Sequence, residues 1–273
     1  MHSPATRASC VLVSLGLLLS VTRPAMAQYG YGTFDPATGE DYHVEIGGTL
    51  WSPSNDVVIS SESLGIPGSD IDFANDLGIE RQRFGEVRLV LRPAKKHKFR
   101  GQFLPMSWTA ESILNRTVVF NGIQYDVGTP VASTLNLTTW RLGYEYDFIT
   151  RDRGFLGALV EAKYTSVQAQ IESVLGTEYA QARTPIPALG LIGRGYLARN
   201  VSVTGEVTAF RLPNISDEYG GNYLDFDVAA TLNLVEQFGI QAGFRSITVF
   251  YKVEDDTGNL KFRGPYLGGI VRF

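Results

Sequence analysis

Apolar and polar residues alternate along most of the chain from about residue 42 onward. The clearest run is 224–234, in which Leu224 and Phe226 begin one face and Asp225 and Asp227 begin the other. A strict period of two is typical of β-strands whose two faces meet different surroundings. The pattern therefore predicts an all-β protein.

Ten segments carry this alternation, and we predict ten strands, with eight as the alternative count. The strands are expected at 42–51, 84–93, 97–108, 134–148, 155–172, 187–198, 201–212, 222–234, 239–252 and 260–273. Four connections are short (93–96, 149–154, 198–200 and 235–238), and five are longer (52–83, 109–133, 173–186, 213–221 and 253–259). Alternating short and longer connections are typical of a closed antiparallel up-and-down barrel whose two rims differ.

The dipeptide Asn121-Gly122 is the strongest two-residue hairpin signal in the sequence. If it forms the turn, paired residue numbers sum to 243 and Phe99 faces Tyr144. The apolar faces of the two flanking strands then coincide, whereas a one-residue slip would separate them. We predict one long hairpin that projects past the barrel, with its tip at Asn121-Gly122. Because Pro105 cannot donate to a ladder, we expect a bulge or break at that position.

The polar faces of these strands carry equal numbers of acidic and basic side chains. The sixteen expected to point into the lumen are Glu45, Glu86, Arg88, Arg92, Lys98, Arg100, Arg141, Glu145, Asp147, Glu161, Lys163, Arg194, Glu206, Asp225, Asp227 and Arg245. The opposite faces are rich in small and medium apolar residues, with aromatic residues near strand ends, which suits a lipid-facing wall with interfacial girdles. A soluble barrel with a solvated charged face is the alternative. We favour a transmembrane β-barrel, which must pair its first and last strands because an open edge is not tolerated in hydrocarbon.

The first 27 residues have the organisation of a secretory signal peptide. Arg7 precedes an apolar stretch at 11–21, and Ala25-Met26-Ala27 supplies a small-x-small cleavage motif. We expect cleavage after Ala27, which makes 28–273 the mature β-barrel domain. The only cysteine, Cys10, lies in the removed part, so we expect no disulfide. An N-terminal membrane anchor is the alternative, although the apolar stretch is shorter than the ~20 residues that a spanning helix needs.

The composition argues against several other classes of protein. An aromatic content of 11% is unlike a disordered chain. A net charge of −4 gives no electrostatic reason to expect a nucleic-acid partner.

The last eight residues, Tyr266 to Phe273, form an alternating apolar segment that ends in an aromatic residue. This ending resembles the assembly signal of Gram-negative outer-membrane β-barrels, with Phe273 as its terminal aromatic. Within that class the chain is similar to the small OmpA-type and OmpW-type barrels, but it has ten expected strands where they have eight. The resemblance implies export, insertion by the barrel-assembly machinery and integral residence in the outer membrane, among its lipids and lipopolysaccharide.

Few residues suggest chemistry. The barrel enzymes of this class need a histidine near a carboxylate or serine, and the mature chain has only His43 and His97, which the topology places at the periplasmic rim. Asp225 and Asp227 could form an acid pair or a cation site, and we favour lumen salt bridges for them. The segment 70–76 superficially resembles a calcium loop but lacks the required glycine, which leaves a loose divalent-ion site as the alternative. We therefore expect no catalytic residue, no metal and no cofactor.

A ten-stranded barrel lies near the size whose interior is just filled by side chains. We therefore expect a mostly plugged, charge-filled lumen and a structural or surface-interaction role, with 52–83 and 109–133 exposed to partners. A narrow, porin-like channel for a small solute is the alternative, and a lipid- or peptide-modifying enzyme is a distant third. The sequence does not indicate a ligand or an oligomeric state.

Overall fold

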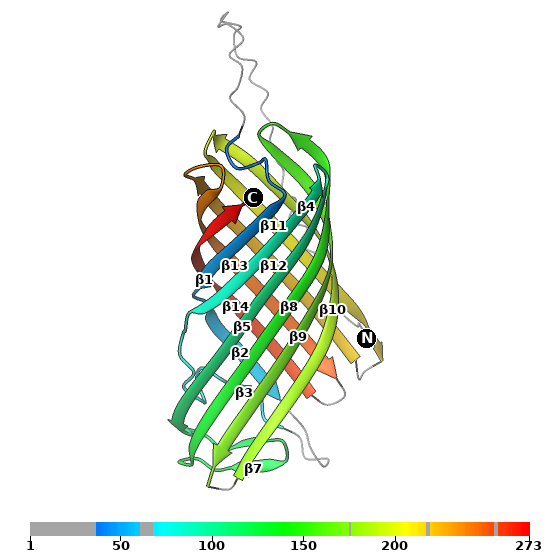
Figure 1. The fold of residues 1–273 in the computed structure, drawn as a ribbon. Helices are drawn as coiled ribbons and strands as arrows, with labels where there is room; N and C mark the ends of the chain where they lie inside the picture. Colours follow the sequence, from blue (N-terminus) through cyan, green and yellow to red (C-terminus); the bar gives the residue numbers. More distant parts are fainter. Residues whose placement is uncertain (1–36, 61–67, 175, 217–218, 254–255) are drawn as a thin grey trace, which may run out of the picture. The chain divides into compact units, whose positions relative to one another are not determined.

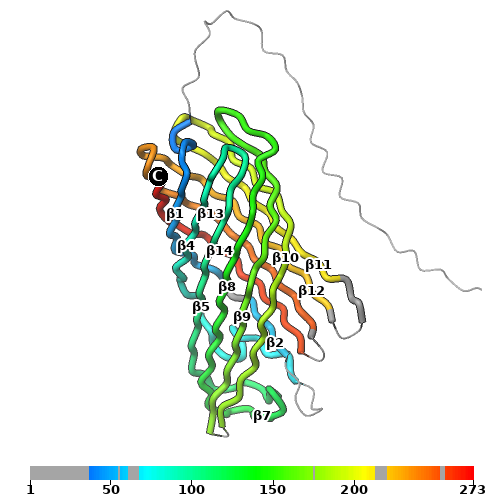
Figure 2. Tube along the Cα trace, turned by 45° about the vertical axis from the view of Figure 1, so that its right-hand side comes forward, coloured from blue at the N-terminus to red at the C-terminus, as the bar shows by residue number. Residues whose placement is uncertain are grey.

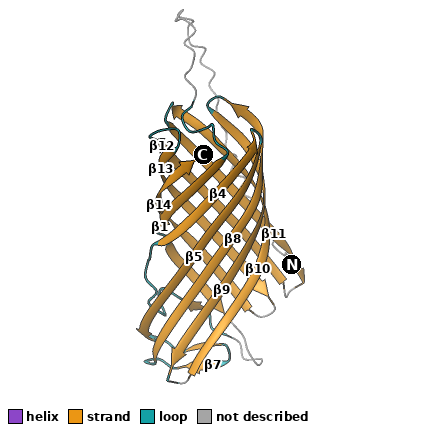
Figure 3. Cartoon of the chain, viewed as in Figure 1, coloured by secondary structure: helices purple, strands orange, loops and turns teal. Residues whose placement is uncertain are grey.

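The computed structural model describes residues 37–60, 68–174, 176–216, 219–253 and 256–273. The described residues form strands and connecting segments (Figure 3). None of them forms a helix that is long and apolar enough to cross a membrane. The described residues belong to one compact unit, Asp35–Phe273. The expected signal peptide and its cleavage site at Ala27 lie outside the described residues.

Ten long strands build the barrel (Figure 1). They are β1 (Val44–Trp51), β4 (Phe84–Ala94), β5 (His97–Ile113), β8 (Pro130–Arg151), β9 (Gly154–Ser173), β10 (Gly176–Ala198), β11 (Val201–Ser216), β12 (Tyr219–Asn233), β13 (Phe238–Val253) and β14 (Asp256–Arg272). Four shorter strands lie between them: β2 (Ser54–Ser60), β3 (Ile71–Asp72), β6 (Val118–Phe120) and β7 (Ile123–Tyr125).

Consecutive long strands pair antiparallel, and β1 pairs with β14 from Glu45↔Arg272 to Trp51↔Tyr266. This last pairing closes the barrel, so the predicted ten-stranded up-and-down barrel is confirmed. The strand β2 then pairs with the earlier half of β14, from Ser54↔Arg263 to Ser60↔Thr257, and thereby continues the line of β1. Part of the expected 52–83 loop is therefore a barrel edge.

Three of the expected longer connections are wrong, because the strands on either side continue through them. The largest difference is in β10, which begins at Gly176 and not at 187. Pro185 lies inside this stretch and Pro187 directly after it, and proline cannot donate to a ladder. Both prolines pair with β9 on one side but lie beyond the last β10–β11 pair, Leu189↔Ala209. They occupy an edge, where proline is tolerated.

The register predicted for the long hairpin is confirmed. Phe99 faces Tyr144, and at the tip Phe120 faces Ile123. The backbone torsion φ is +49° at Asn121 and +81° at Gly122. Positive φ at both central residues defines a type I′ turn, which matches the twist of the flanking strands.

The tip of this hairpin does not project freely, which corrects the second part of that prediction. Val118, Phe120 and Tyr125 are fully buried, so β6 and β7 fold back onto the apolar interior. Pro105 causes no bulge in the ladder with β8, where it pairs with Thr138. The expected break lies on the other side, because the ladder between β4 and β5 ends at Phe103.

Both ends of the described barrel chain lie at one rim, which we call the terminal rim, and the opposite end is the far rim (Figures 1 and 2). The strands β5, β8, β9 and β10 are 17, 22, 20 and 23 residues long. A spanning β-strand needs only ~9–11 residues. These four strands therefore form a tall wall that runs well past the others toward the far rim (Figure 2).

The outer surface of this wall changes character along its height. Near the terminal rim the outward residues of β8 and β9 are apolar, with Leu142 67% and Val160 57% exposed. This apolar belt ends at a row of aromatic side chains, in which Phe103, Trp140 and Tyr164 are neighbours on β5, β8 and β9. On the far-rim side of the row, the same face carries polar residues such as Gln168. The belt therefore covers only the half of the wall near the terminal rim.

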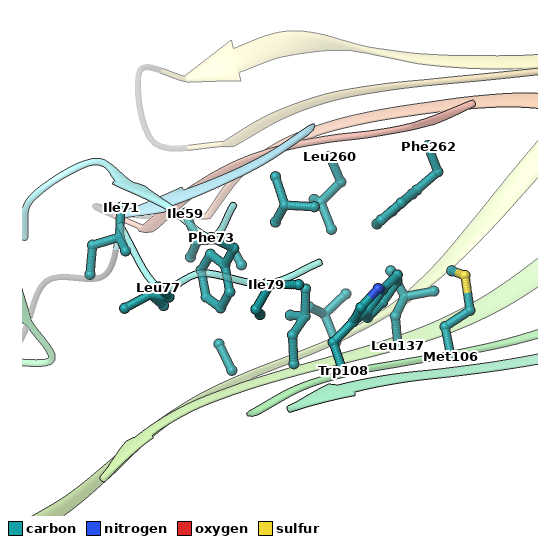
Figure 4. Packing of buried hydrophobic residues seen from close by; sticks show 14 of the residues in the cluster. Ile59, Ile71, Phe73, Leu77, Ile79, Met106, Trp108, Leu137, Leu260 and Phe262 are labelled. Carbon is teal, nitrogen blue, oxygen red and sulfur yellow. The ribbon is translucent and has the colours of Figure 1, made fainter. Parts of the chain in front are cut away.

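The inner surface changes in the opposite sense. On β5, Lys98, Arg100 and Gln102 point inward on the terminal-rim side of the aromatic row. Met106 and Trp108 point inward on its far-rim side. The far half of the barrel is filled by buried apolar side chains, where Trp108 stacks on Phe262 with ring centroids 5.6 Å apart (Figure 4). The prediction of a polar lumen along the whole barrel is therefore wrong for the far half, where the interior is apolar, as in a water-soluble protein.

Candidate functional site

The lumen beside the terminal rim holds the charges predicted from the sequence, and a segment before β1 closes it. In this segment, residues 37–43, Ala37, Thr38 and Tyr42 are buried. The carbonyl of Thr38 accepts hydrogen bonds from Tyr196 Oη at 3.0 Å and Asn233 Nδ2 at 2.7 Å. Because these donors belong to β10 and β12, the segment is fixed across the opening.

Deeper in the lumen than this closure, seven acids and six bases form one continuous network of ion pairs. Starting at the terminal rim, the chain of contacts runs through Asp147, Lys98, Glu145, Arg100, Glu206, Arg141, Glu161, Lys163, Asp225, Arg245, Glu86, Arg88 and Asp227. Its members come from seven strands, so the network crosses the lumen and does not merely line one wall.

Two arginines act as central links in this network. Arg141 contacts both Glu161 and Glu206 and donates to Gln102 Oε1 at 3.1 Å. Arg245 donates to Asp225 from Nε at 3.0 Å and from Nη2 at 2.7 Å. Paired donors of this kind hold carboxylates in a fixed geometry and satisfy charges that burial would otherwise penalise.

The remaining predicted lumen residues lie outside this network. Arg194 pairs with Glu40 at 2.9 Å, and Glu45 pairs with Arg272 at 2.6 Å. Arg92 donates to the backbone carbonyls of Glu40 and Lys95. All sixteen predicted side chains are thus buried or half-buried on the inner surface.

Two inward charges of the terminal-rim lumen, Glu40 and Arg272, are absent from the sixteen predicted from the sequence. Arg272 lies two residues after Ile270, and both are buried on the same face of β14. The parity of this strand could have placed Arg272 inside, but the apolar Ile270 disguised the polar face. Glu40 precedes the first strand, so no alternation could indicate its position.

Little free space remains among the charges. The cavity there measures about 60 Å³ and is bounded by Tyr42, Arg88, Arg100 and Arg141, among others. Since one water needs ~10–15 Å³ by this measure, the space holds only a few waters. Within the described part of the chain, the 37–43 segment, the ion pairs and the apolar cluster thus follow one another along the lumen.

The two histidines lie at the terminal rim, away from the network. His97 Nδ1 is 2.6 Å from Tyr144 Oη, and the backbone N–H of His43 donates to the carbonyl of Phe273 at 2.7 Å. Both side chains are exposed.

The acidic segment 70–76 is organised by its own backbone and by Arg116. Asp72 accepts from the backbone N–H groups of Ala74 and Asn75, and Asp76 accepts from Arg116 Nε at 3.0 Å. A cation, Arg116, already occupies the carboxylate of Asp76. Among the described residues, no group of three or more acidic, histidine or cysteine side chains could hold a metal ion.

The Asp76–Arg116 pair makes the far-rim structure sensitive to acid. The hydrogen bond from Arg116 holds the pKa of Asp76 below its ordinary value. A carboxyl whose pKa is lowered by folding stabilises the fold above its unfolded pKa of ~3.9, and that contribution is lost as the pH falls through the folded value. We expect amide-exchange protection factors in 71–79 to fall below about pH 4. In Asp76→Asn they should be low already at pH 7, whereas Asp126→Asn, an exposed control, should behave like the natural chain. Unchanged protection in Asp76→Asn would contradict this role.

No family model matches the chain, and no curated protein matches it. Among solved structures, it is similar to the outer-membrane protease OmpT from Escherichia coli, with a TM-score of 0.59 and 10% identity over 87% of this chain and 98% of that chain. Weaker likenesses are to the attachment invasion locus protein Ail of Yersinia pestis (TM-score 0.37, 11% identity, 85% and 99% covered) and to an outer-membrane channel of Pseudomonas putida F1 (0.40, 11%, 90% and 100%). At these identities the likeness concerns the fold alone.

A closed ten-stranded barrel whose outer wall carries an exposed apolar belt is an integral outer-membrane β-barrel, and this is the class of the protein. Short turns lie on the periplasmic side in such barrels. All four connections between long strands at the terminal rim are short, whereas at the far rim the β1–β4 and β5–β8 connections are long. This difference places the terminal rim in the periplasm and the far rim outside the cell.

Proposed function

We propose that this protein is a non-conducting barrel that anchors a rigid β-structured platform outside the membrane for surface interaction. The observation that carries the proposal is the filling of the lumen by three successive layers: the 37–43 segment, the ion-pair network and the apolar cluster.

The network argues against the alternative of a narrow channel. A conducting pore needs binding groups that ions or solutes can reach and leave. Here Arg141 and Arg245 are engaged by carboxylates from several strands. Displacing a paired charge leaves its partner unpaired in a buried site, which costs about 3–5 kcal/mol.

The platform is the extracellular part of the wall formed by β5, β8, β9 and β10. Its outer face is polar, and Ser107 Oγ donates to Asn136 Oδ1 at 2.6 Å between neighbouring strands. Its inner face packs on the apolar cluster, and the hairpin tip at Asn121-Gly122 is held against it. We propose that lipopolysaccharide and other surface partners contact this wall and the far-rim segments.

Assembly is proposed to follow the route that the C-terminal residue implies. Phe273 is 69% exposed and lies at the end of β14 beside the start of β1, with its backbone N–H donating to the carbonyl of Val44 at 2.8 Å. An exposed aromatic at the closing seam is available to the barrel-assembly machinery before closure.

We also propose that the protein is not an enzyme. His97 is engaged by Tyr144 at the periplasmic rim, and His43 lies at the same rim. A lipid- or peptide-modifying activity that is lost on replacing both histidines would contradict this part of the proposal.

A planar-bilayer recording tests the proposed function directly. We expect the folded protein, verified by heat-modifiable gel mobility, to insert without producing steady conductance steps. A general porin in the same bilayer is the positive control for insertion and recording. Reproducible nanosiemens steps from this protein would favour the channel and refute the filled lumen.

A further inference from the structure

The seam between β10 and β11 opens on the far-rim side of the apolar belt. Backbone pairing between these strands ends at Leu189↔Ala209, so the part of β10 from 176 to 187 pairs only with β9. Pro185 and Pro187 lie in β10 just beyond this last pair, and neither can donate a backbone hydrogen bond across the seam. Figures 1 and 2 both show β10 diverging from β11 in this region.

An apolar cavity of about 260 Å³ lies directly behind this open seam. Its seam side is formed by Ala182 and Ile186 of β10 and by Phe210 and Leu212 of β11. The rest of its wall includes Leu137, Val167, Tyr223, Val249 and Leu260. A second cavity of about 240 Å³ adjoins it and shares Val167, Ala182, Thr184 and Tyr251.

The size and lining of this space suit a hydrocarbon group. An apolar cavity of about 150 Å³ can remain free of water and bind benzene. The cavity behind the seam is larger than this, and its neighbour adds a similar volume, so the two together have room for an alkyl chain.

The height of the seam indicates where such a chain would come from. Tyr164 of the aromatic row pairs with Pro185. Leu189, which is 67% exposed, lies on the lipid-facing wall just on the terminal-rim side of that pair. Aromatic rows of this kind mark the level at which hydrocarbon meets headgroups. The seam therefore opens at the surface of the outer leaflet.

Basic side chains surround the same opening. Arg183 on β10 and Arg211 on β11 are exposed on the outer face at its two sides, and Lys252 of β13 lines the cavity. Asp256 lines the second cavity, farther from the membrane belt. The charge at the mouth thus favours an anionic headgroup.

We propose that this cavity is a binding site for a single-chain anionic amphiphile, with its alkyl chain behind the seam and its headgroup at Arg183 and Arg211. The site borders the ion-pair network only at Tyr223, which donates to Asp225 at 3.1 Å, and it does not require passage through the lumen. Two sources share this chemistry, a free alkyl carboxylate and one chain of an anionic lipid, and the limited volume favours the free amphiphile.

Native mass spectrometry of the full barrel, released from a neutral detergent, tests the site with decanoate as the probe. We expect one bound decanoate per barrel, at least tenfold weaker binding in Ala182→Phe and unchanged binding in Ala230→Phe, which adds the same volume on the lipid-facing wall. The Arg183→Gln, Arg211→Gln double variant should weaken decanoate several-fold and leave neutral decanol unaffected. Leu212→Trp is a second filling variant in case Ala182→Phe does not fold.

The outcomes separate the alternatives. Absence of both a decanoate and a phosphatidylglycerol adduct, or equal binding by the natural chain and both filling variants, would overturn the proposal. Binding of phosphatidylglycerol alone, abolished by Ala182→Phe, would support the site and assign it to a lipid chain. Neither result depends on whether the lumen conducts, so the site and the proposed function can fail separately.

Discussion

Replacing Asp225 with alanine is expected to lower the free energy of unfolding by about 3–5 kcal/mol. Asp225 accepts from Arg245 at 2.7 Å and lies 3.4 Å from Lys163 Nζ, and all three side chains are buried. The substitution leaves two buried cations with fewer partners, and the loss of a partner is much more costly than the net value of the intact pair. Urea unfolding in lipid vesicles, followed by gel mobility, measures the change.

The matched control is Asp152→Ala in the periplasmic turn after β8, where the side chain is exposed. An exposed charge contributes at most ~1 kcal/mol, so this variant should unfold like the natural protein. If Asp225→Ala were equally mild, the buried network would not contribute to stability as argued.

Arginine in place of Val160 is expected to destabilise the barrel by about 2–4 kcal/mol and to reduce its assembly into membranes. Val160 lies on β9 in the middle of the apolar belt, between Leu156 and the aromatic Tyr164, and is 57% exposed. A charge at this depth faces hydrocarbon, where it cannot be solvated. The fraction of folded protein recovered in vesicles and its unfolding free energy are the measurements.

Gln168→Arg is the control, on the same face of the same strand and eight residues farther along. Because Gln168 lies on the far-rim side of the aromatic row, the unfolding free energy of its variant should remain within about 0.5 kcal/mol of that of the natural protein. Equal destabilisation by both substitutions would mean that the belt extends past Tyr164, against the structure.

These two experiments test features that the sequence predicted to different degrees. The lumen position of Asp225 followed from its alternation with Leu224 and Phe226, because a period of two assigns each residue to a face. The register of β5 against β8 followed from Asn121-Gly122, since a two-residue turn fixes every later pair.

The apolar face of the tall wall changes from the outer to the inner surface along the barrel, and the parity of apolar positions in the sequence changes with it. On β8 the apolar positions are even from Trp140 to Phe148 and odd at Leu135 and Leu137. On β9 they are even at Val160 and odd at Val167. On both neighbouring strands the apolar residues thus move from the outer to the inner face at the same height, and no bulge interrupts the ladder there. A face-by-face pattern read along one strand cannot show this height, because it depends on the pairing of several strands.

The sequence by itself determined the strand parity, the count of ten strands and the register of the long hairpin, because turns and alternation are local. Only the tertiary structure decided which face is inside at each height, how far β10 extends past its prolines, and that 37–43 closes the periplasmic rim. It also decided which acid meets which base across the lumen. These features depend on contacts between residues far apart in the chain, such as Arg194 with Glu40 and Arg272 with Glu45, and no local pattern encodes them.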